Sequence, residues 1–328
     1  MSRWEGRTVF VTGADGFIGS HLVERLVELG ATTRALVLYN SLQSWGWLDD
    51  SPVRDEVEIV LGDVRDPETL RAPMEGADAV FHLAALIAIP YSYRAPASYV
   101  HTNIQGTLNV LDEARRAEVP HVVHTSTSEV YGTALRVPID EEHPLQAQSP
   151  YSATKIAADK LAESYHRTFD LPVTPVRPFN TFGPRQSARA IIPTVITQAL
   201  EGSSVAVGNV TPTRDFTFVA DTVEGFVKAG ASDAGIGRVV NLGNGKEISV
   251  RDLVLEIASM LGVEAEVTVE EARMRPGASE VERLCADATL ARELLGWEPQ
   301  VSLREGLERT IEWIRGNSGR FKAGLYAV

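Results

Sequence analysis

Arg7-Thr8-Val9-Phe10-Val11-Thr12-Gly13-Ala14-Asp15-Gly16-Phe17-Ile18-Gly19 decides the fold, because it reads as a buried strand, a glycine-rich turn and the start of a helix. The helical pattern that follows stops at Gly30. Gly13 permits a tight turn, Gly16 lets the backbone approach a pyrophosphate, and Gly19 allows close packing of helix on strand. A purely structural turn is the alternative. The cofactor contacts predicted in this segment are Gly13, Asp15, Gly16, Phe17, Ile18 and Gly19.

The rest of the N-terminal half alternates between strand and helix patterns. Strands are predicted at residues 34–38, 57–61, 79–85, 121–126 and 173–178, and helices at 102–117 and 151–169. Such alternation predicts a doubly wound parallel Rossmann sheet of the α/β class. Ligands of these sheets bind beyond the carboxyl ends of the strands. The residues that fall there are Asp15, Asp63, Ala84, Ala85, Ser126–Glu129 and Asn180.

A smaller and less regular C-terminal lobe is expected after Asn180. Glycines and prolines divide this part of the chain into short pieces, with helical patterns at 191–200, 221–231, 249–261 and 303–314. We expect the lobe to cover the cofactor edge and to bind the substrate. Residues 1–180 would form the dinucleotide-binding domain, with 216–246 returning to it, and residues 181–215 and 247–328 would form the substrate-binding lobe.

The composition of the chain argues against several classes of protein. The net charge of −13 argues against a nucleic-acid partner, which would require a basic face. Cys285 is the only cysteine, so neither a disulfide framework nor a thiolate metal site is expected, and the histidines show no metal-site spacing. No signal-peptide pattern and no apolar run long enough for a membrane span occurs in the sequence. We therefore expect a soluble cytoplasmic protein.

The second informative stretch runs from Thr125 to Lys155 and has the composition of a proton-transfer site. Hydroxyls and a carboxylate follow the strand at 121–126, and Tyr151 and Lys155 then stand four residues apart at the start of a helical pattern. Positions i and i+4 share one helix face, so Lys155 can lie beneath the Tyr151 phenol. A neighbouring ammonium favours the phenolate, which predicts a pKa of Tyr151 lowered from about 10 toward neutrality.

The chain resembles the extended short-chain dehydrogenase/reductase family of nucleotide-sugar epimerases and dehydratases. The resemblance implies a bound NAD(P), a nucleoside-diphosphate sugar as substrate, and a homodimer built from the helices after the fourth and fifth strands. The matching residues are Gly13, Gly16, Gly19, Asp63, His82–Ala85, Asn103, Tyr151, Lys155 and Arg177–Asn180. Implied cofactor contacts, besides those of the glycine turn, are Asn40, Asp63, Val64, Leu83, Ala84, Ala85, Ser126, Tyr151 and Lys155.

Within this family, Thr127, Ser128 and Glu129 are similar to the signature of sugar 4,6-dehydratases, in which Ser128 stands where many relatives carry Asp. Residues 85–93 and 184–190 are most similar to N-acetylglucosamine-nucleotide 4,6-dehydratases of legionaminic-acid-type pathways. The resemblance implies that Tyr151 oxidises the sugar at C4. Glu129 would then remove the C5 proton and pass it to the departing C6 hydroxyl, because a serine hydroxyl is too weakly acidic for that step.

Arginines are the residues expected to bind the diphosphate of the substrate. The resemblance assigns this role to Arg214 and Arg275, with Arg185 and Asn180 as further substrate contacts. After the second strand the chain has Tyr39-Asn40-Ser41 in place of the aspartate that many NAD-binding relatives carry. The missing carboxylate leaves NADP open, but no arginine follows directly to attract a 2′-phosphate, so NAD is favoured over NADP.

Three other functions remain open at this point. UDP-glucuronate decarboxylases and nucleotide-sugar 4-epimerases share the tyrosine and lysine, although a decarboxylase needs a cation for the C6 carboxylate and residues 87–90 are apolar. A non-catalytic dinucleotide-sensing protein is the remaining alternative, which the intact Tyr151 and Lys155 disfavour. The residues do not distinguish UDP, GDP and dTDP, nor the substituent at C2 of the sugar.

Overall fold

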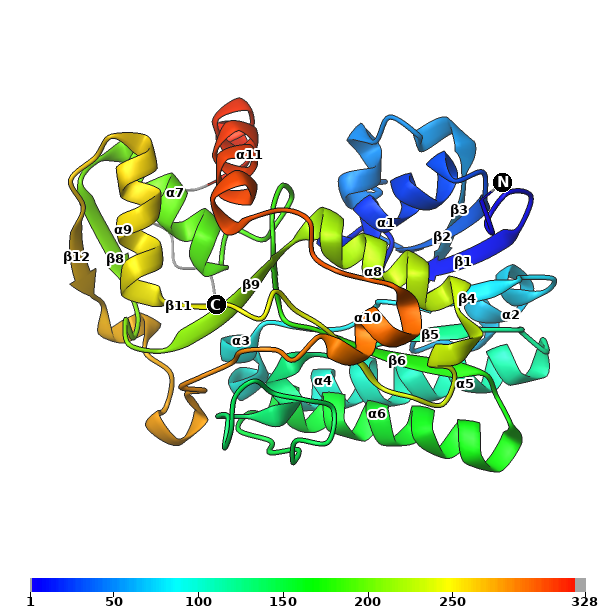
Figure 1. Ribbon diagram of the computed structural model, residues 1–328. Coiled ribbons are helices and arrows are strands. Elements are labelled where there is room, and N and C mark those ends of the chain that lie inside the picture. Colours follow the sequence, from blue (N-terminus) through cyan, green and yellow to red (C-terminus); the bar gives the residue numbers. More distant parts are fainter. Residues whose placement is uncertain (1, 322–328) are drawn as a thin grey trace.

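The main element of the structure, a computed structural model that describes residues 2–321, is a parallel sheet of seven strands in the order β10-β6-β5-β4-β1-β2-β3 (Figure 1). Every pair of neighbouring strands is parallel, which confirms the predicted doubly wound α/β fold. The strands are β1 (Thr8–Thr12), β2 (Thr32–Leu38), β3 (Val57–Gly62), β4 (Ala79–His82), β5 (Val122–Thr125), β6 (Val173–Pro178) and β10 (Val240–Leu242).

Helices cover both faces of this sheet (Figure 1). On one face α1 (Phe17–Glu28) packs against α8 (Val219–Ala231), and on the other α5 (Gly106–Arg116) packs against α2 (Glu68–Met74) and α6 (Pro150–Phe169). Each helix buries an apolar stripe at helical spacing, which in α1 consists of Leu22, Val23 and Leu26. Among residues 2–321, no helix combines the length and apolar character that a membrane span requires.

The helix predicted at 102–117 is in part a π-helix. After α3 (Ile89–Arg94) and α4 (Pro96–Tyr99), the segment Val100–Gln105 is π-helical and leads into α5. The Asn103 side chain bonds both the N–H and the carbonyl of Leu86, and the Thr107 hydroxyl donates to the Asn103 carbonyl at 2.7 Å. The wider turn therefore positions Asn103 to hold the loop that follows β4.

The smaller lobe contains two short sheets. One joins β7 (Asn180–Phe182), β9 (Thr213–Phe218) and β11 (Glu247–Ser249), and the other joins β8 (Ser204–Val207) and β12 (Glu266–Val269). The helices α7 (Ile191–Glu201), α9 (Val250–Leu261) and α11 (Leu303–Gly316) belong to this region (Figure 1). In contrast, α10 (Thr289–Leu295) packs against α8 and β10 of the main sheet.

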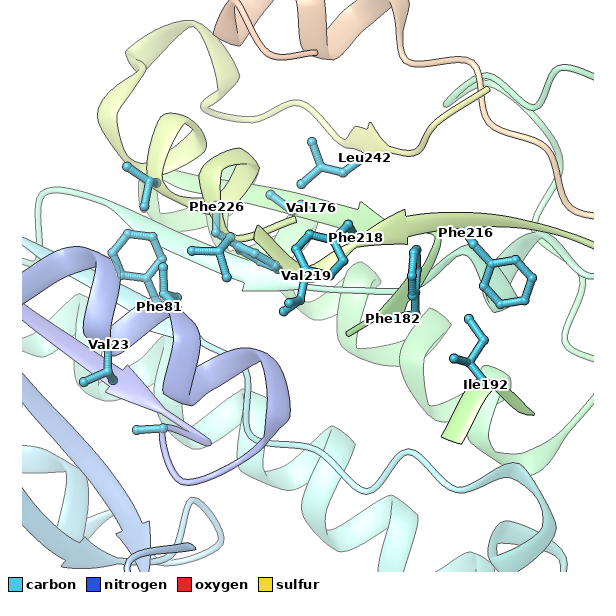
Figure 2. Packing of buried hydrophobic residues seen from close by; sticks show 14 of the residues in the cluster. Val23, Phe81, Val176, Phe182, Ile192, Phe216, Phe218, Val219, Phe226 and Leu242 are labelled. Carbon is cyan, nitrogen blue, oxygen red and sulfur yellow. The ribbon is translucent and has the colours of Figure 1, made fainter. Parts of the chain in front are cut away.

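One hydrophobic core runs from the main sheet into the smaller lobe (Figure 2). The ring of Phe182 makes edge contacts with Phe216 and Phe218 at centroid distances of 6.1 and 5.7 Å, and all three rings are buried. Full burial of each such side chain stabilises the fold by roughly 1.5–3 kcal/mol. Phe182 of β7 and Phe216 and Phe218 of β9 belong to the small sheet. The same core cluster contains Val176 of β6 and Leu242 of β10, so it is continuous between the strand that carries Arg214 and the main sheet.

Candidate active site

The glycine-rich turn after β1 forms a cradle that only glycine fits. Gly13 has a φ of +67°, and a Cβ added there would lie 2.7 Å from the backbone nitrogen of Ala84. A Cβ on Gly19 would lie 2.0 Å from the carbonyl oxygen of Gly13. Gly16 forms the N-terminal cap of α1, and no side chain caps this helix end. The turn therefore offers backbone N–H groups and the positive end of a helix dipole to a pyrophosphate.

Besides the glycines, the loops after β1, β2 and β3 hold the predicted cofactor contacts Asp15, Asn40, Asp63 and Val64. Burial raises the pKa of Asp15, which lies within the glycine-rich turn. The amide of Asn40 bonds the backbone of Leu38, Leu42 and Ser44 and so shapes the loop after β2.

After β3, the Asp63 carboxylate pairs with Arg65, and the hydrogen bond from Arg65 holds its pKa below the ordinary value. Next to it, Val64 is buried and its carbonyl accepts from Asn109. A cofactor contact of Asp63, as the resemblance implies, would thus share its carboxylate with Arg65.

The loop after β4 closes over the end of β1. The Leu83 N–H donates to the Thr12 carbonyl at 3.1 Å, and the Ala84 N–H donates to the Thr12 hydroxyl at 3.2 Å. Ala84 is also the residue whose backbone approaches Gly13. Leu83, Ala84 and Ala85 are therefore at the same sheet edge as the glycine turn, where sequence analysis predicted them.

Tyr151 and Lys155 occupy the first turns of α6. Ser149 and Ser152 form a capping box and Pro150 takes the first helical position, so the helix begins just before Tyr151. The Lys155 ammonium donates to the Thr125 carbonyl at the end of β5, at 2.6 Å. This hydrogen bond fixes the lysine to the sheet edge at which the predicted catalytic residues lie.

The prediction that the pKa of Tyr151 is lowered is wrong for the protein without cofactor and substrate. Tyr151 is only 6% exposed and packs edge-on against Tyr99, and this burial raises the pKa of its phenol. A hydrogen bond with Thr127 lowers it and the charge of Glu129 raises it, each by less than burial does. Burial also lowers the pKa of Lys155 to about 8, which weakens its positive charge near neutrality.

Thr127, Ser128 and Glu129 begin a short 3₁₀ turn (Ser128–Tyr131) directly after β5. The Thr127 hydroxyl caps this turn by accepting from the Glu129 N–H at 3.2 Å. Ser128 is buried. The charge of Glu129 raises the pKa of both the Tyr151 phenol and the Arg214 guanidinium, so the carboxylate is within electrostatic range of both.

A buried charge network behind Lys155 was missed by sequence analysis. The Asp159 carboxylate accepts from the Arg177 guanidinium at 2.9 and 3.1 Å and from the Ser126 hydroxyl at 2.8 Å, and lies 3.2 Å from the His124 ring. Ser126, predicted as a cofactor contact, thus uses its hydroxyl inside the protein. A detectable signal was Asp159 four residues after Lys155, on the same helix face, with Arg177 inside an apolar strand.

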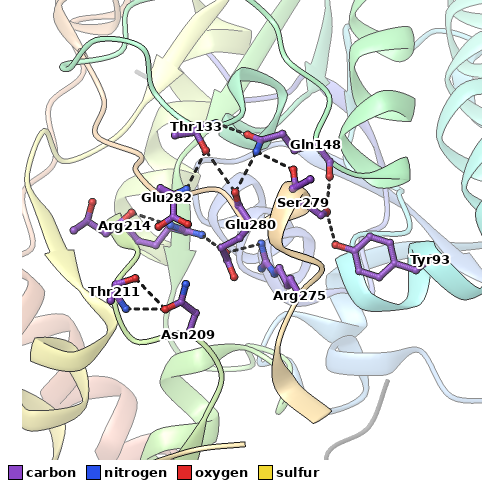
Figure 3. A network of polar contacts seen from close by, with 12 residues as sticks. Tyr93, Thr133, Gln148, Asn209, Thr211, Arg214, Arg275, Ser279, Glu280 and Glu282 are labelled. Atoms are coloured by element: carbon purple, nitrogen blue, oxygen red, sulfur yellow. Dashed lines mark hydrogen bonds and ion pairs between the residues drawn. The ribbon is translucent and has the colours of Figure 1, made fainter. Parts of the chain in front are cut away.

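The predicted substrate arginines fall into two places, and Figure 3 shows the place that Arg214 and Arg275 share. Arg214 and Arg275 meet at the carboxylate of Glu280, at 3.2 and 3.6 Å. Arg185 instead pairs with Glu24 of α1 at 2.8 Å. Asn180, at the start of β7, has a buried side-chain oxygen with no hydrogen-bond partner in the described part of the chain.

No cluster of three or more histidine, cysteine, aspartate or glutamate side chains suited to a metal ion occurs between residues 2 and 321. The candidate reactive side chains predicted for this sheet edge are the phenol, amine, hydroxyl and carboxylate groups of Tyr151, Lys155, Thr127, Ser128 and Glu129.

The fold and this site define a Rossmann-type protein of the extended short-chain dehydrogenase/reductase class. The family described as GDP-mannose 4,6 dehydratase matches residues 10–310, and the chain belongs to this family. The predicted resemblance to nucleotide-sugar epimerases and dehydratases is thereby confirmed.

Both 4-epimerases and 4,6-dehydratases are among the relatives that are similar to the chain over nearly its full length. UDP-glucose 4-epimerase of Mycolicibacterium smegmatis is 37% identical over 94% of this chain and 98% of its own. dTDP-glucose 4,6-dehydratase of Streptomyces antibioticus is 36% identical over 94% of this chain and 92% of its own. The solved structure of DesIV, a dTDP-glucose 4,6-dehydratase from Streptomyces venezuelae with NAD and TYD bound, has a TM-score of 0.87 at 31% identity, covering 96% of this chain and 99% of its own.

Proposed function

We propose that the protein is an NAD-dependent nucleotide-sugar 4,6-dehydratase that converts a nucleoside-diphosphate sugar to the 4-keto-6-deoxy sugar. The observation that carries this proposal is Glu129, a carboxylate within electrostatic range of both Tyr151 and Arg214. Oxidation at C4 needs only Tyr151 and Lys155, whereas elimination across C5 and C6 needs a further base. The dehydratases among the relatives support the same reaction.

The glycine cradle at Gly13 and Gly19 fits a dinucleotide, because any side chain there would collide with backbone. When bound, NAD accepts a hydride from C4 of the sugar, returns a hydride to C6 and adds a positive charge to the site. NAD is favoured over NADP, since Tyr39-Asn40-Ser41, without an arginine, follows β2 and the solved DesIV structure contains NAD. The Lys155 ammonium, held by Thr125, supplies the chain's own positive charge near Tyr151.

In this mechanism Tyr151 takes the proton of the sugar 4-hydroxyl, and Thr127 hydrogen-bonds the C4 oxygen as it becomes a ketone. The ketone makes the C5 hydrogen acidic, and Glu129 removes it. Glu129 then gives that proton to the C6 hydroxyl, which leaves as water. C5 afterwards regains one proton, which balances the proton that Tyr151 removed at the start. Glu129 therefore acts as base and as acid, while Ser128 contacts the substrate.

The substrate is proposed to be UDP- or GDP-N-acetylglucosamine, on the similarity of residues 85–93 and 184–190 to dehydratases acting on such sugars. Arg214, Arg275 and Asn180 would bind its diphosphate. Arg185 would contribute less directly, because it is paired with Glu24. We further propose a homodimer that uses the helices after β4 and β5.

Epimerisation at C4 is the second candidate, and a specific observation favours it: an epimerase is among the relatives of highest identity, and Ser128 replaces the aspartate acid of many dehydratases. Chromatographic separation of the products followed by mass spectrometry distinguishes the candidates, because a C4 epimer has the same mass as its substrate. Incubation with UDP- and GDP-N-acetylglucosamine should yield a sugar nucleotide that has lost one water. An isomer of unchanged mass, or loss of carbon dioxide from UDP-glucuronate, would contradict the proposal.

A further inference from the structure

The Lys155 ammonium is buried without a carboxylate at ion-pair distance among residues 2–321. The residue is 4% exposed, and its ammonium donates to the Thr125 carbonyl at 2.6 Å. Burial lowers the pKa of Lys155 to about 8, and the charge of Asp159 opposes this effect. Asp159 stands four residues after Lys155, on the same face of α6.

Asp159 also holds the strand end to which Lys155 is bonded. Its Oδ1 atom lies 3.2 Å from the His124 Nε2 atom, and its Oδ2 atom accepts from the Ser126 hydroxyl at 2.8 Å. His124 and Ser126 flank Thr125, the residue whose carbonyl accepts from Lys155. One face of α6 therefore contacts the end of β5 at three consecutive residues, twice through the carboxylate and once through the ammonium.

The neighbouring strands bring no other negative charge to the lysine. His124 on β5 and His82 on β4 are buried, and burial lowers the pKa of both imidazoles, so both are neutral near pH 7. Arg177 on β6 lies on the far side of Asp159 and donates to its Oδ2 atom at 2.9 and 3.1 Å.

Two acidic groups remain on the elements beside Lys155. Tyr151 is protonated before the reaction, because burial raises the pKa of its phenol. Glu129, in the turn after β5, acts on Tyr151 and on Arg214. Asp159 is thus the carboxylate whose charge acts on Lys155.

We propose that Asp159 is a positioning residue for the reaction: its carboxylate holds the end of β5 for Lys155 and supplies the negative charge that keeps this buried lysine an ammonium. The inference rests on the first step of the proposed function, the oxidation at C4 by Tyr151 and Lys155. Asp159 acts through Lys155, since its own oxygens bond buried groups of the protein.

The same charge acts on Tyr151 in a way that makes the inference distinctive. A nearby carboxylate disfavours the phenolate, and Asp159 raises the pKa of Tyr151. Its removal should therefore move the alkaline limb of the kcat–pH profile to lower pH without moving the acidic limb to higher pH. General damage to the site would instead lower the rate at every pH.

NMR titration of the lysines in the presence of NAD tests this charge effect directly. The chain has five lysines, so carbon-13 labelling at the lysine ε carbon gives few resonances, and Lys155→Met identifies the one that belongs to Lys155. In Asp159→Asn the titration midpoint of Lys155 should fall by about one pH unit, as expected for the loss of a nearby opposite charge. The alkaline limb of kcat should fall by the same amount.

Glu163→Gln is the matched control. It makes the same change of charge on the same helix, four residues after Asp159, where Glu163 pairs with Lys160 and Arg167 at the surface. This variant should keep the wild-type titration midpoint of Lys155 and the wild-type kcat–pH profile.

A second variant covers the destabilisation expected of Asp159→Asn, which leaves Arg177 buried without its counter-charge. The double variant Asp159→Asn with Arg177→Gln leaves no unpaired charge of this ion pair in the interior. The midpoint of Lys155 should still fall, because Asp159 is the member of the pair that acts on it. Asp159→Glu keeps the charge and should keep the midpoint near that of wild type.

An unchanged midpoint of Lys155 in the single and the double variant would overturn the inference, and so would a lowered midpoint with an unchanged kcat–pH profile. The NMR titration needs no turnover. A wild type that forms no product, combined with a lowered midpoint in the variants, would therefore contradict the proposed function and still support the charge effect of Asp159 on Lys155.

Discussion

Replacement of Asp159 by asparagine should strongly destabilise the fold. The Asp159 and Arg177 side chains are 4% and 5% exposed, and the carboxylate receives hydrogen bonds from Arg177 and Ser126. Burial would raise its pKa, but the hydrogen bond from His124 and the charge of Arg177 prevail and lower the pKa to about 2. Against an ordinary value of 3.8, this corresponds to roughly 2–3 kcal/mol of stabilisation of the charged form.

The loss in Asp159→Asn should exceed that figure, because Arg177 would remain buried without its counter-charge. Removing one partner of a buried pair costs roughly 3–5 kcal/mol. Since the folded pKa of Asp159 is depressed, its contribution is present above the ordinary pKa and is lost as pH falls toward about 2. The gap between wild type and variant should therefore be constant near neutral pH and narrow below about pH 4.

Urea unfolding followed by circular dichroism measures this difference. Asp112→Asn is the control: Asp112 pairs with Arg115 and Arg116 at the surface of α5, and its loss should cost less than about 1 kcal/mol. An Asp159→Asn variant that is destabilised no more than the Asp112→Asn control would refute the assignment of Asp159 and Arg177 as a stabilising buried pair.

Two further predictions concern the cofactor turn and the lysine. Gly19→Ala should abolish NAD binding and lower the melting temperature, because the added Cβ would lie 2.0 Å from the Gly13 carbonyl oxygen and the backbone would have to shift. Fluorescence titration with NAD measures the affinity, and an unchanged affinity would contradict the role of the glycine turn in binding the cofactor. The turnover rate should fall as pH rises through about 8, because burial lowers the pKa of Lys155 to that value and the ammonium is lost above it. A profile of kcat against pH that is flat up to pH of about 10 would contradict the need for a charged lysine.

Local signals in the sequence were sufficient for the sheet and for the Tyr151–Lys155 pair. The strands from β1 to β6 are rich in apolar residues, although β2, β3 and β6 include Arg34, Glu58 and Arg177. The capping residues Ser149 and Pro150 place the start of α6. The pairing of β10 with β6 joins residues far apart in the sequence, and its three residues carry no distinctive pattern. Such pairing is decided by tertiary packing rather than by propensity.

Within the site, sequence analysis identified which residues carry reactive or charged groups, but not which side chains pair with one another. Glu280 and Asp159 are charged residues on ordinary polar positions of the sequence, and only the fold brings them to Arg214 and Arg177. The pKa of Tyr151 was predicted in the wrong direction, because the i,i+4 spacing with Lys155 shows a charge nearby but not the burial that outweighs it.

The most direct test of the account is the reaction of wild type and Glu129→Gln with the accepted nucleotide sugar in deuterated water, followed by NMR. The account predicts that wild type forms a C6 methyl group with deuterium at C5. Glu129→Gln should bind NAD and substrate and oxidise C4, but should form no methyl group. A Glu129→Gln variant that eliminates water at the wild-type rate, or a wild type that only inverts C4 without a C6 methyl product, would contradict the central role of Glu129.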